Sequence, residues 1–244
     1  MNNTVLIIGA FSEVSVSIAH KFAHHGYSIQ LAARNISRLQ RHMSDIELRY
    51  NTDVSLHEID ILKNEDIKNF ISKLNKIPDI VISVVGYMGN ELSQTFDNSE
   101  ASLIMKTNYE GPSLLLNEFA NVFYKRKYGT IIGVSSVAGE RGRAKNYLYG
   151  SAKAGFTAFL SGLRNKLFNS NVRVITVIPG YVSTPATKNL DLPPLLTAKT
   201  KEVANAMYSA INKKKDIIYV RSVWFFIMTI IKLIPEKIFK KLNL

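Results

Sequence analysis

Ser135-Ser136-Val137-Ala138-Gly139 and Tyr149-Gly150-Ser151-Ala152-Lys153 bound the stretch around which this chain is organised. Residues 129–134, just before it, are rich in β-branched types and predict a strand that ends at the serines. The pattern after it predicts a helix from Ala144 to Phe168, in which Tyr149 and Lys153 share one face, one turn apart. An ammonium group beside a phenol favours phenolate, so we expect the pKa of Tyr149 to fall from about 10 toward working pH. Such a tyrosine can give or take a proton at a carbonyl or alcohol oxygen.

Short apolar segments alternate with helical patterns along the rest of the chain. The expected strands are Val5–Ile8, Ser28–Ala33, Val54–Ile59, Ile80–Val85, Ile131–Val134, Val172–Ile178 and Ile217–Val220. The other expected helices are Val14–His25, Ile36–Arg49, Asn64–Lys73, Glu100–Tyr124 and Lys199–Asn212. Strands with little polar alternation, joined by helices, predict an α/β fold with a doubly wound parallel sheet of about seven strands and helices on both faces. Ligand is then expected at the carboxyl ends of the strands.

Length and composition limit the possible functions. The 244 residues fit one domain with a large core, and the absence of cysteine excludes a disulfide framework and thiolate chemistry. The formal net charge of +12 favours an anionic partner, either a phosphate ligand or a membrane surface. The chain has no zinc spacing, basic-aromatic interleaving or repeat, so nucleic acid is not expected. No signal-peptide pattern opens the chain, so we expect a cytoplasmic protein.

Ser136, Tyr149 and Lys153, with a strand-glycine-helix unit near the N-terminus, resemble the short-chain dehydrogenase/reductase family from about Thr4 to Val220. The resemblance implies a Rossmann fold and an NADP(H)-dependent oxidoreductase that transfers a hydride between nicotinamide and a carbonyl or alcohol carbon. It implies that Ser136 donates to the substrate oxygen, that Tyr149 passes the proton, and that Lys153 binds the nicotinamide ribose. Asn108 would lie in a helix locally distorted by Gly111 and Pro112, and would hold a water in a proton relay behind Lys153. The alternative for Asn108 is a helix-interior asparagine that kinks its helix by hydrogen bonding.

The first strand-to-helix turn departs from the family pattern. The family has three glycines here, at the positions of Gly9, Glu13 and Ser15, and only the first is kept. Ser15 is small enough for close packing, and Ser12 can cap a helix whose N–H groups hold phosphate. A Glu13 carboxylate facing a pyrophosphate would repel it, whereas one facing outward would suit the helix dipole. The residues of this turn expected at the cofactor are Gly9, Phe11, Ser12, Glu13 and Val14.

The cofactor choice is indicated by the end of the second strand. Enzymes that prefer NAD usually carry an acidic residue there, whereas this chain has Arg34 and Asn35, with Arg38 one turn later. A guanidinium can pair with the 2′-phosphate of NADP and stack on adenine, although a solvated helix start would also fit. The resemblance adds further cofactor positions and a substrate lid over 185–198. These further positions are Asp60, Ile61, Gly86, Pro179, Gly180, Val182 and Thr184, of which Asp60 could equally be a helix-capping residue.

The last residues depart from a plain reductase. We divide the chain into a Rossmann-fold domain, 1–221, and an apolar and basic helical tail, 222–244. The apolar run is too short to span a bilayer, and it suits a helix lying on a membrane surface or one buried against a second subunit of a homo-oligomer, a dimer or tetramer. A similar ending occurs in the family branch that reduces polyprenyl-phosphate-linked keto-sugars. We therefore expect a lipid-linked or anionic keto-sugar as substrate, in cell-envelope polysaccharide synthesis. The alternatives are a 3-oxoacyl or other small-carbonyl reductase, and a catalytically inactive cofactor-binding scaffold.

Overall fold

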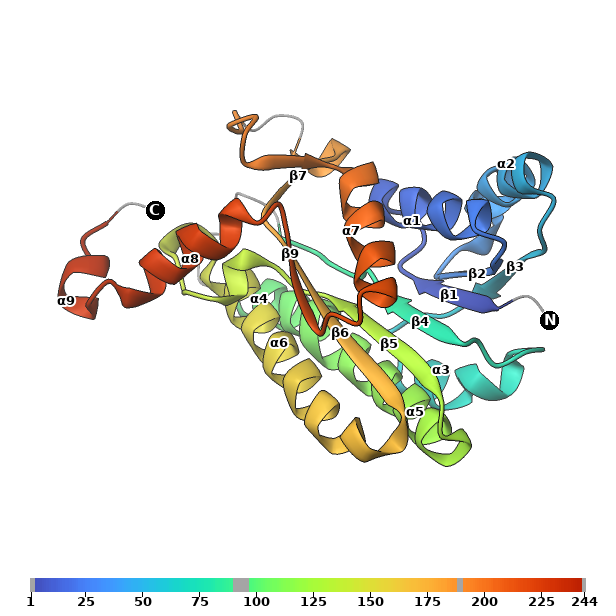
Figure 1. The fold of residues 1–244 in the computed structure, drawn as a ribbon. Helices are drawn as coiled ribbons and strands as arrows, with labels where there is room; N and C mark the ends of the chain where they lie inside the picture. The colour runs from blue at the N-terminus through green and yellow to red at the C-terminus, as the bar shows by residue number, and fades with distance from the viewer. Residues whose placement is uncertain (1–2, 90–96, 188–190, 243–244) are drawn as a thin grey trace.

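The computed structural model describes residues 3–89, 97–187 and 191–242. Its centre is a seven-stranded parallel sheet in the order β3-β2-β1-β4-β5-β6-β9 (Figure 1). The strands are β1 (Thr4–Ile8), β2 (Ser28–Ala33), β3 (Val54–Glu58), β4 (Ile80–Ser83), β5 (Gly129–Val134), β6 (Val172–Pro179) and β9 (Ile217–Val220). All seven expected strands are present, and the predicted doubly wound fold is confirmed.

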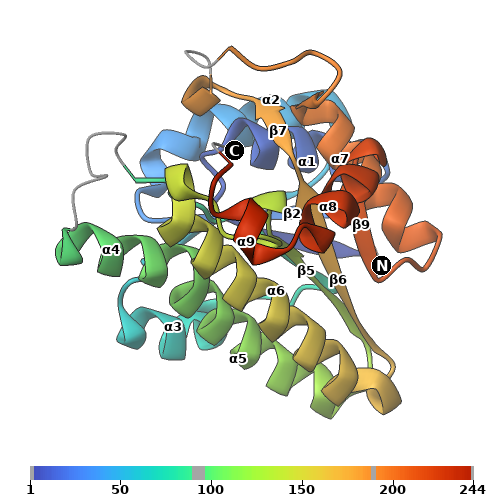
Figure 2. The same ribbon diagram turned by 90° about the vertical axis from the view of Figure 1, so that its left-hand side faces the viewer.

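Helices cover both faces of the sheet (Figures 1 and 2). One face carries α1 (Glu13–His24), α2 (Gln40–Tyr50) and α7 (Thr200–Asn212), and the other carries α3 (Asn64–Phe70), α4 (Asn98–Met105), α5 (Gly111–Arg126) and α6 (Tyr147–Leu167). Within β1, Val5 and Ile7 join the core under the first set, whereas Leu6 and Ile8 join the core under the second. Both faces of a strand are therefore buried, which explains why the strands lack polar alternation.

The crevice for a ligand follows from the strand order. From β1 the chain first adds β2 and β3 on one side, and then crosses to add β4, β5, β6 and β9 on the other. The connections that leave the carboxyl ends of β1 and β4 therefore run in opposite directions and open a crevice between them. The loops after β1, β2, β4, β5 and β6 converge on this edge of the sheet.

The helix expected over Glu100–Tyr124 is continuous but not regular. A π-helical turn, Lys106–Glu110, separates α4 from α5. Inside it, the Asn108 amide donates to the Ile104 carbonyl, four residues earlier, at 2.9 Å. Gly111 follows at a point where a Cβ atom would press on the backbone of Ile61. The local distortion expected around Asn108 is therefore present, and single-turn π bulges are frequent at functional sites.

Two features differ from the expected elements. The fourth strand ends at Ser83 rather than Val85, and the Val85 carbonyl accepts a hydrogen bond from the Lys153 side chain. The region expected to be a lid, together with the residues just before it, contains two strands that the sequence pattern did not predict, β7 (Tyr181–Ser183) and β8 (Thr197–Lys199). They pair in parallel as a separate small sheet. Part of the expected lid, 188–190, lies outside the described residues.

The tail forms two helices, α8 (Val223–Leu233) and α9 (Glu236–Phe239). They extend from the end of the sheet past the N-terminal end of α6 (Figure 2). Trp224 and Met228 are buried against Val137 and Ile178, so the inner face of α8 is part of the protein core. Within the described ranges, no helix is both long and apolar enough to cross a membrane.

Candidate active site

Lys153 is held at the carboxyl edge of the sheet by two strand-end carbonyls. Its ammonium group donates to the Val134 carbonyl at 3.0 Å and to the Val85 carbonyl at 3.1 Å. The side chain is almost completely buried, and burial lowers the pKa of Lys153 to about 7. Removing an ammonium from water disfavours its charged form, so this lysine is only partly charged at neutral pH.

Tyr149 lies one turn before Lys153 on α6, with the lysine Nζ 5.8 Å from the centre of its ring. Burial raises the pKa of Tyr149 to about 12, and a hydrogen bond with Ser136 offsets part of that rise. The expected fall of this pKa toward working pH is therefore wrong. Burial opposes phenolate, and the cation expected to favour it is itself partly neutralised by burial. Tyr149 is thus a protonated hydroxyl at neutral pH, suited to donate a proton.

The two neighbouring serines have different surroundings. The Ser135 hydroxyl bonds to Thr157 Oγ1 at 2.6 Å and donates to the Lys153 carbonyl at 3.1 Å, so it ties β5 to α6. The Ser136 hydroxyl accepts from the Ala138 N–H and bonds to Tyr149. Ser136 is therefore the serine placed at the tyrosine hydroxyl, as the spacing predicts.

Asn108 is fully buried behind this group. Its amide donates to the Tyr87 carbonyl at 2.6 Å, and its Oδ1 accepts from the Tyr87 N–H at 3.1 Å. A Cβ atom on Gly86 would lie 3.5 Å from Asn108 Oδ1 and 3.8 Å from Lys153 Nζ. Asn108, Gly86 and Lys153 therefore meet at one point, where Asn108 fixes the loop after β4. A proton relay through Asn108 stays a prediction.

The first turn is built around a left-handed glycine. Gly9 has φ +83°, and a Cβ atom there would lie 3.2 Å from Val85. Ser15, where the family has a glycine, is fully buried and donates its hydroxyl to the Gly9 carbonyl at 2.8 Å. Ser12 caps α1 by accepting from the Ser15 N–H at 3.0 Å. Two hydroxyls thus support a turn that glycines usually form, and the helix N-terminus stays open toward the crevice.

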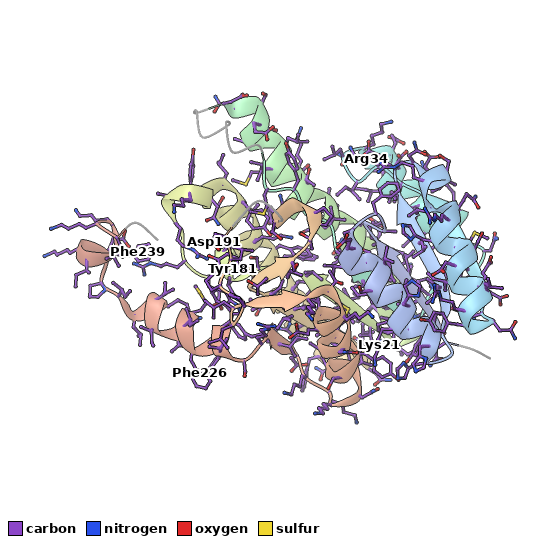
Figure 3. The ribbon with its side chains drawn as sticks, turned by 90° about the horizontal axis from the view of Figure 1, so that it is seen from above. Lys21, Arg34, Tyr181, Asp191, Phe226 and Phe239 are labelled. Atoms are coloured by element: carbon purple, nitrogen blue, oxygen red, sulfur yellow. The ribbon has the colours of Figure 1, made fainter. Side chains whose placement is uncertain are left out.

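A cavity of about 570 Å³ runs from this turn to the loop after β4. Asp60 accepts from the Leu62 N–H in a local turn and also lines the cavity. Arg34 lines the same cavity and is exposed (Figure 3). The cavity brings together these predicted cofactor residues: Gly9, Phe11, Ser12, Arg34, Asp60, Ile61 and Gly86.

Other predicted cofactor residues lie outside that cavity. Glu13 is exposed at the start of α1, and Val14 packs on the core beneath the turn. The Arg38 guanidinium stacks over the Phe11 ring, 4.6 Å from its centre. Asn35 accepts a hydrogen bond from the Ser37 hydroxyl. Arg38 therefore contacts Phe11, which lines the cavity, but does not line it itself. Val14 and Asn35 support the local structure.

The loop after β6 is arranged by a residue that sequence reasoning missed. The Thr187 hydroxyl donates to the Val182 carbonyl at 2.7 Å and accepts from the Thr184 N–H at 3.1 Å. Thr184, Thr187 and Glu13 all border a second cavity of about 650 Å³. Pro179 is the last residue of β6, and Gly180 lies directly under Trp224. A threonine three residues after another can make such a turn, but nothing in the sequence marked it.

Comparison with known proteins agrees with this geometry. A family model described as short chain dehydrogenase matches residues 3–193. The chain belongs to the short-chain dehydrogenase family. As a member of that family it is an oxidoreductase that uses NAD(P).

Relatives of this short-chain dehydrogenase include the 3-oxoacyl-[acyl-carrier-protein] reductase FabG of Chlamydia trachomatis, 27% identical over 195 residues, which cover 78% of each chain. An uncharacterized oxidoreductase of Mycobacterium tuberculosis is 28% identical over 217 residues, covering 87% of this chain and 86% of the relative. Among solved structures, a short-chain dehydrogenase from Sphingobium yanoikuyae in complex with NADPH superposes with a TM-score of 0.82 at 20% identity, covering 96% of this chain and 97% of the other. At that identity the superposition shows the fold.

The residues fit a nicotinamide dinucleotide. A side chain at Gly9 would press on the loop after β4, and one at Gly86 would approach both Asn108 and Lys153, so both glycines keep space open at the crevice. Ser12 and the N-terminus of α1 could hold the phosphates, and Arg34 and Asp60 could hold the adenosine end. Tyr149 and Lys153 could hold the nicotinamide end. When bound, the cofactor supplies the hydride.

Proposed function

We propose that this short-chain dehydrogenase reduces a ketone with NADPH. The observation that carries the proposal is the Ser136–Tyr149 hydrogen bond beside buried Lys153, whose ammonium group donates to the carbonyl of Val85 in the cavity wall. The hydroxyls of Ser136 and Tyr149 bind the ketone oxygen, and Tyr149 donates the proton as the oxygen becomes an alcohol. A tyrosine that is protonated at neutral pH fits reduction. The test is NADPH oxidation at 340 nm with ketone substrates, in wild type and in the variants described below.

The preference for NADPH over NADH is supported by Arg34. It lines the cavity at the end of β2, and no acidic residue lies between Leu31 and Asn35. A guanidinium there can bind a 2′-phosphate, whereas the ribose hydroxyl of NADH would have no carboxylate partner at that strand end. Titration of the protein with NADPH and with NADH, followed by nicotinamide fluorescence, measures the preference directly. Equal dissociation constants would contradict it.

For the substrate, we infer a keto-sugar on an anionic polyprenyl carrier, used in cell-envelope polysaccharide synthesis. The net charge of +12 and the tail, which is both basic and apolar, support a substrate that has a phosphate and a lipid chain. The second candidate is a 3-oxoacyl thioester, because the Chlamydia trachomatis relative is a 3-oxoacyl-[acyl-carrier-protein] reductase. A turnover panel of polyprenyl-phosphate keto-sugars and 3-oxoacyl carrier-protein thioesters separates the two. Activity confined to the thioesters would exclude the keto-sugar.

For the tail, we propose peripheral binding to an anionic membrane surface on the cytoplasmic side. The outer side of α8 exposes Phe226, which is 63% exposed and lies away from the body of the protein (Figure 3), as well as Phe225, Ile230 and Leu233. Lys237, Lys240 and Lys241 follow and are exposed. Each basic residue near an anionic leaflet contributes about 1 kcal/mol. NADPH use and the absence of cysteine suit the reducing cytoplasm.

Flotation with vesicles containing phosphatidylglycerol tests this membrane binding. We expect co-flotation at low salt that weakens at high salt, because salt screens the lysines. Phe226→Ser together with Ile230→Ser should abolish co-flotation, whereas Leu48→Ser, on α2 and 88% exposed, is the matched control. A protein that stays in solution as a stable oligomer at both salt concentrations would show that the outer face is a subunit interface instead.

We also propose a homo-oligomer, a dimer or tetramer. Tyr109, Leu114 and Tyr124 are exposed along the π turn and α5, more apolar surface than a lone helix needs. Light scattering during gel filtration of the full chain measures the mass, and a monomer would refute the proposal. The division of the chain at residue 222 into a domain and a tail stays a prediction.

A further inference from the structure

Trp224, the only tryptophan in the chain, lies directly on the loop that follows β6. A Cβ atom added to Gly180 would overlap the Trp224 indole, so the ring fills the space where a side chain would stand. The indole N–H donates to the Leu196 carbonyl at 3.0 Å, and the ring meets Tyr181 edge-on at 5.3 Å. Trp224 is 4% exposed. One side chain of the tail therefore contacts both ends of the segment from Gly180 to Leu196.

In its described residues, the segment that Trp224 contacts has only short elements. Its two strands, β7 and β8, have three residues each and pair only with each other. A short two-stranded sheet is marginal without packing against another element. Within the loop, Thr187 joins Val182 to Thr184, but these bonds are local. Contacts from outside the segment are therefore needed to fix its position. Val182 and Ala198 pack on the main core, Arg221 donates to the Pro194 and Leu195 carbonyls, and Trp224 covers Gly180 and binds the Leu196 carbonyl.

The tail also reaches the loop that follows Ser136. The Arg141 guanidinium pairs with Glu236 at 2.7 Å, donates to the Ile234 carbonyl at 3.2 Å, and lies 4.3 Å from the centre of the Phe239 ring. Glu140 pairs with Lys232 at 3.2 Å. These contacts tie the far end of α8 and all of α9 to the body of the protein. The position of Trp224 is thus fixed from both ends of α8.

We propose that Trp224 is a positioning residue for the nicotinamide end of the cofactor site. It holds the loop Pro179–Thr184 in its binding conformation, so the tail supports the active site through this loop. The proposal rests on the proposed function, because that function assigns this loop to the nicotinamide. It predicts that substitution of Trp224 weakens binding of the nicotinamide half of the cofactor and leaves binding of the adenosine half unchanged. The adenosine half is assigned to the region of Arg34, which lies at a distance from Tyr181 (Figure 3).

The experiment compares two ligands by isothermal titration calorimetry, NADPH and adenosine 2′,5′-bisphosphate, which lacks the nicotinamide half. In Trp224→Ala we expect the loop Pro179–Thr184 to occupy its binding conformation for only part of the time. If that part is about a tenth, the affinity for NADPH falls about tenfold. Binding of adenosine 2′,5′-bisphosphate should stay within about twofold, because the first turn and Arg34 do not touch Trp224. Trp224→Phe keeps an aromatic ring on Gly180 and should restore most of the NADPH affinity.

Met228→Ala is the matched control. Met228 is fully buried one turn further along α8 and belongs to the same apolar cluster, so its truncation should lower the melting temperature. Both ligands should bind this variant as they bind wild type. If Trp224→Ala weakens both ligands equally, or neither, at a temperature where the variant is folded, the positioning role is refuted. A wild-type protein that binds adenosine 2′,5′-bisphosphate and NADPH with equal affinity would instead refute the assignment of the loop to the nicotinamide.

Discussion

The turn after β1 and the segment from Ser136 to Lys153 lie on the same edge of the sheet, but they keep the family pattern to different extents. The turn has lost two of three glycines, whereas the segment keeps every functional group. In the turn, buried Ser15 donates to the Gly9 carbonyl, so a side chain supports the backbone where the family has a glycine. In the segment, the roles that we propose for a phenol and an ammonium group depend on the protons of those groups. A role that depends on backbone shape can pass to other residues, whereas a role that depends on one functional group cannot.

The largest effect should come from removing the Tyr149 hydroxyl. Tyr149→Phe keeps the ring but has no proton to donate, so kcat should fall by roughly 10²–10⁴-fold. NADPH affinity should stay near wild type, since most cofactor contacts come from other residues. Steady-state kinetics and fluorescence titration measure the two quantities. Tyr147→Phe is the control, because Tyr147 is exposed. A kcat of Tyr149→Phe within a few-fold of wild type would show that the segment does not depend on this hydroxyl.

The second effect concerns the pH dependence of stability through Lys153. Its pKa is about 7 in the folded protein and near 10.5 in an unfolded chain. Between these values the unfolded chain binds the extra proton, so the free energy of unfolding should rise with pH from about 7 toward 10. Below pH 7, Lys153 is protonated in both the folded and the unfolded protein, and folding then bears the full free-energy cost of burying its charge. Across the window the gain is on the order of a few kcal/mol.

Urea denaturation of wild type and Lys153→Met over this pH range measures the gain. The variant cannot titrate at position 153, so the difference between the two proteins should grow in favour of wild type as the pH rises. The window ends near pH 10, because the raised pKa of Tyr149, about 12, makes stability fall with pH beyond that point. Parallel stability profiles for the two proteins would show that Lys153 keeps its full charge when folded.

The third effect tests the cofactor end of the cavity. Arg34→Ala should weaken NADPH about ten- to a hundredfold, because a charge-assisted pair with phosphate contributes on the order of 1.5–3 kcal/mol. NADH binding should be unchanged. Arg41→Ala, an exposed arginine in the first turn of α2, is the matched control. An equal loss of affinity for both cofactors would mean that Arg34 stabilises the structure at this edge of the sheet and does not bind the 2′-phosphate.

The smallest effect should come from the residue that departs most from the family. Glu13 is exposed at the first position of α1, where a carboxylate is stabilised by the helix dipole. Glu13→Gln should therefore change NADPH affinity by less than about threefold and lower stability by about 0.3–1 kcal/mol. Calorimetric titration and thermal unfolding measure both. A tenfold gain in affinity on removing the charge would show that Glu13 faces the pyrophosphate, and that serines replace the lost glycines incompletely.

The seven main strands, their parallel pairing in βα units and the set Ser136, Tyr149 and Lys153 could all be predicted from the amino-acid sequence. Strands buried on both faces need unbroken apolar runs, and residues four apart on a helix must share a face, so both signals are local. The sequence also indicated the distortion around Asn108 through Gly111 and Pro112. The roles assigned to the site residues stay predictions, which the variants above test.

Other features depend on how distant parts of the chain pack together. The pairing of β7 with β8 joins three-residue strands across a long segment, and strands so short carry no periodic signal. The rise of the Tyr149 pKa and the fall of the Lys153 pKa come from burial, which depends on every element packed around them. The apolar run of the tail did not show which face would be buried. Only folding placed Trp224 on Gly180, because the space for that ring is made by a glycine distant in the sequence.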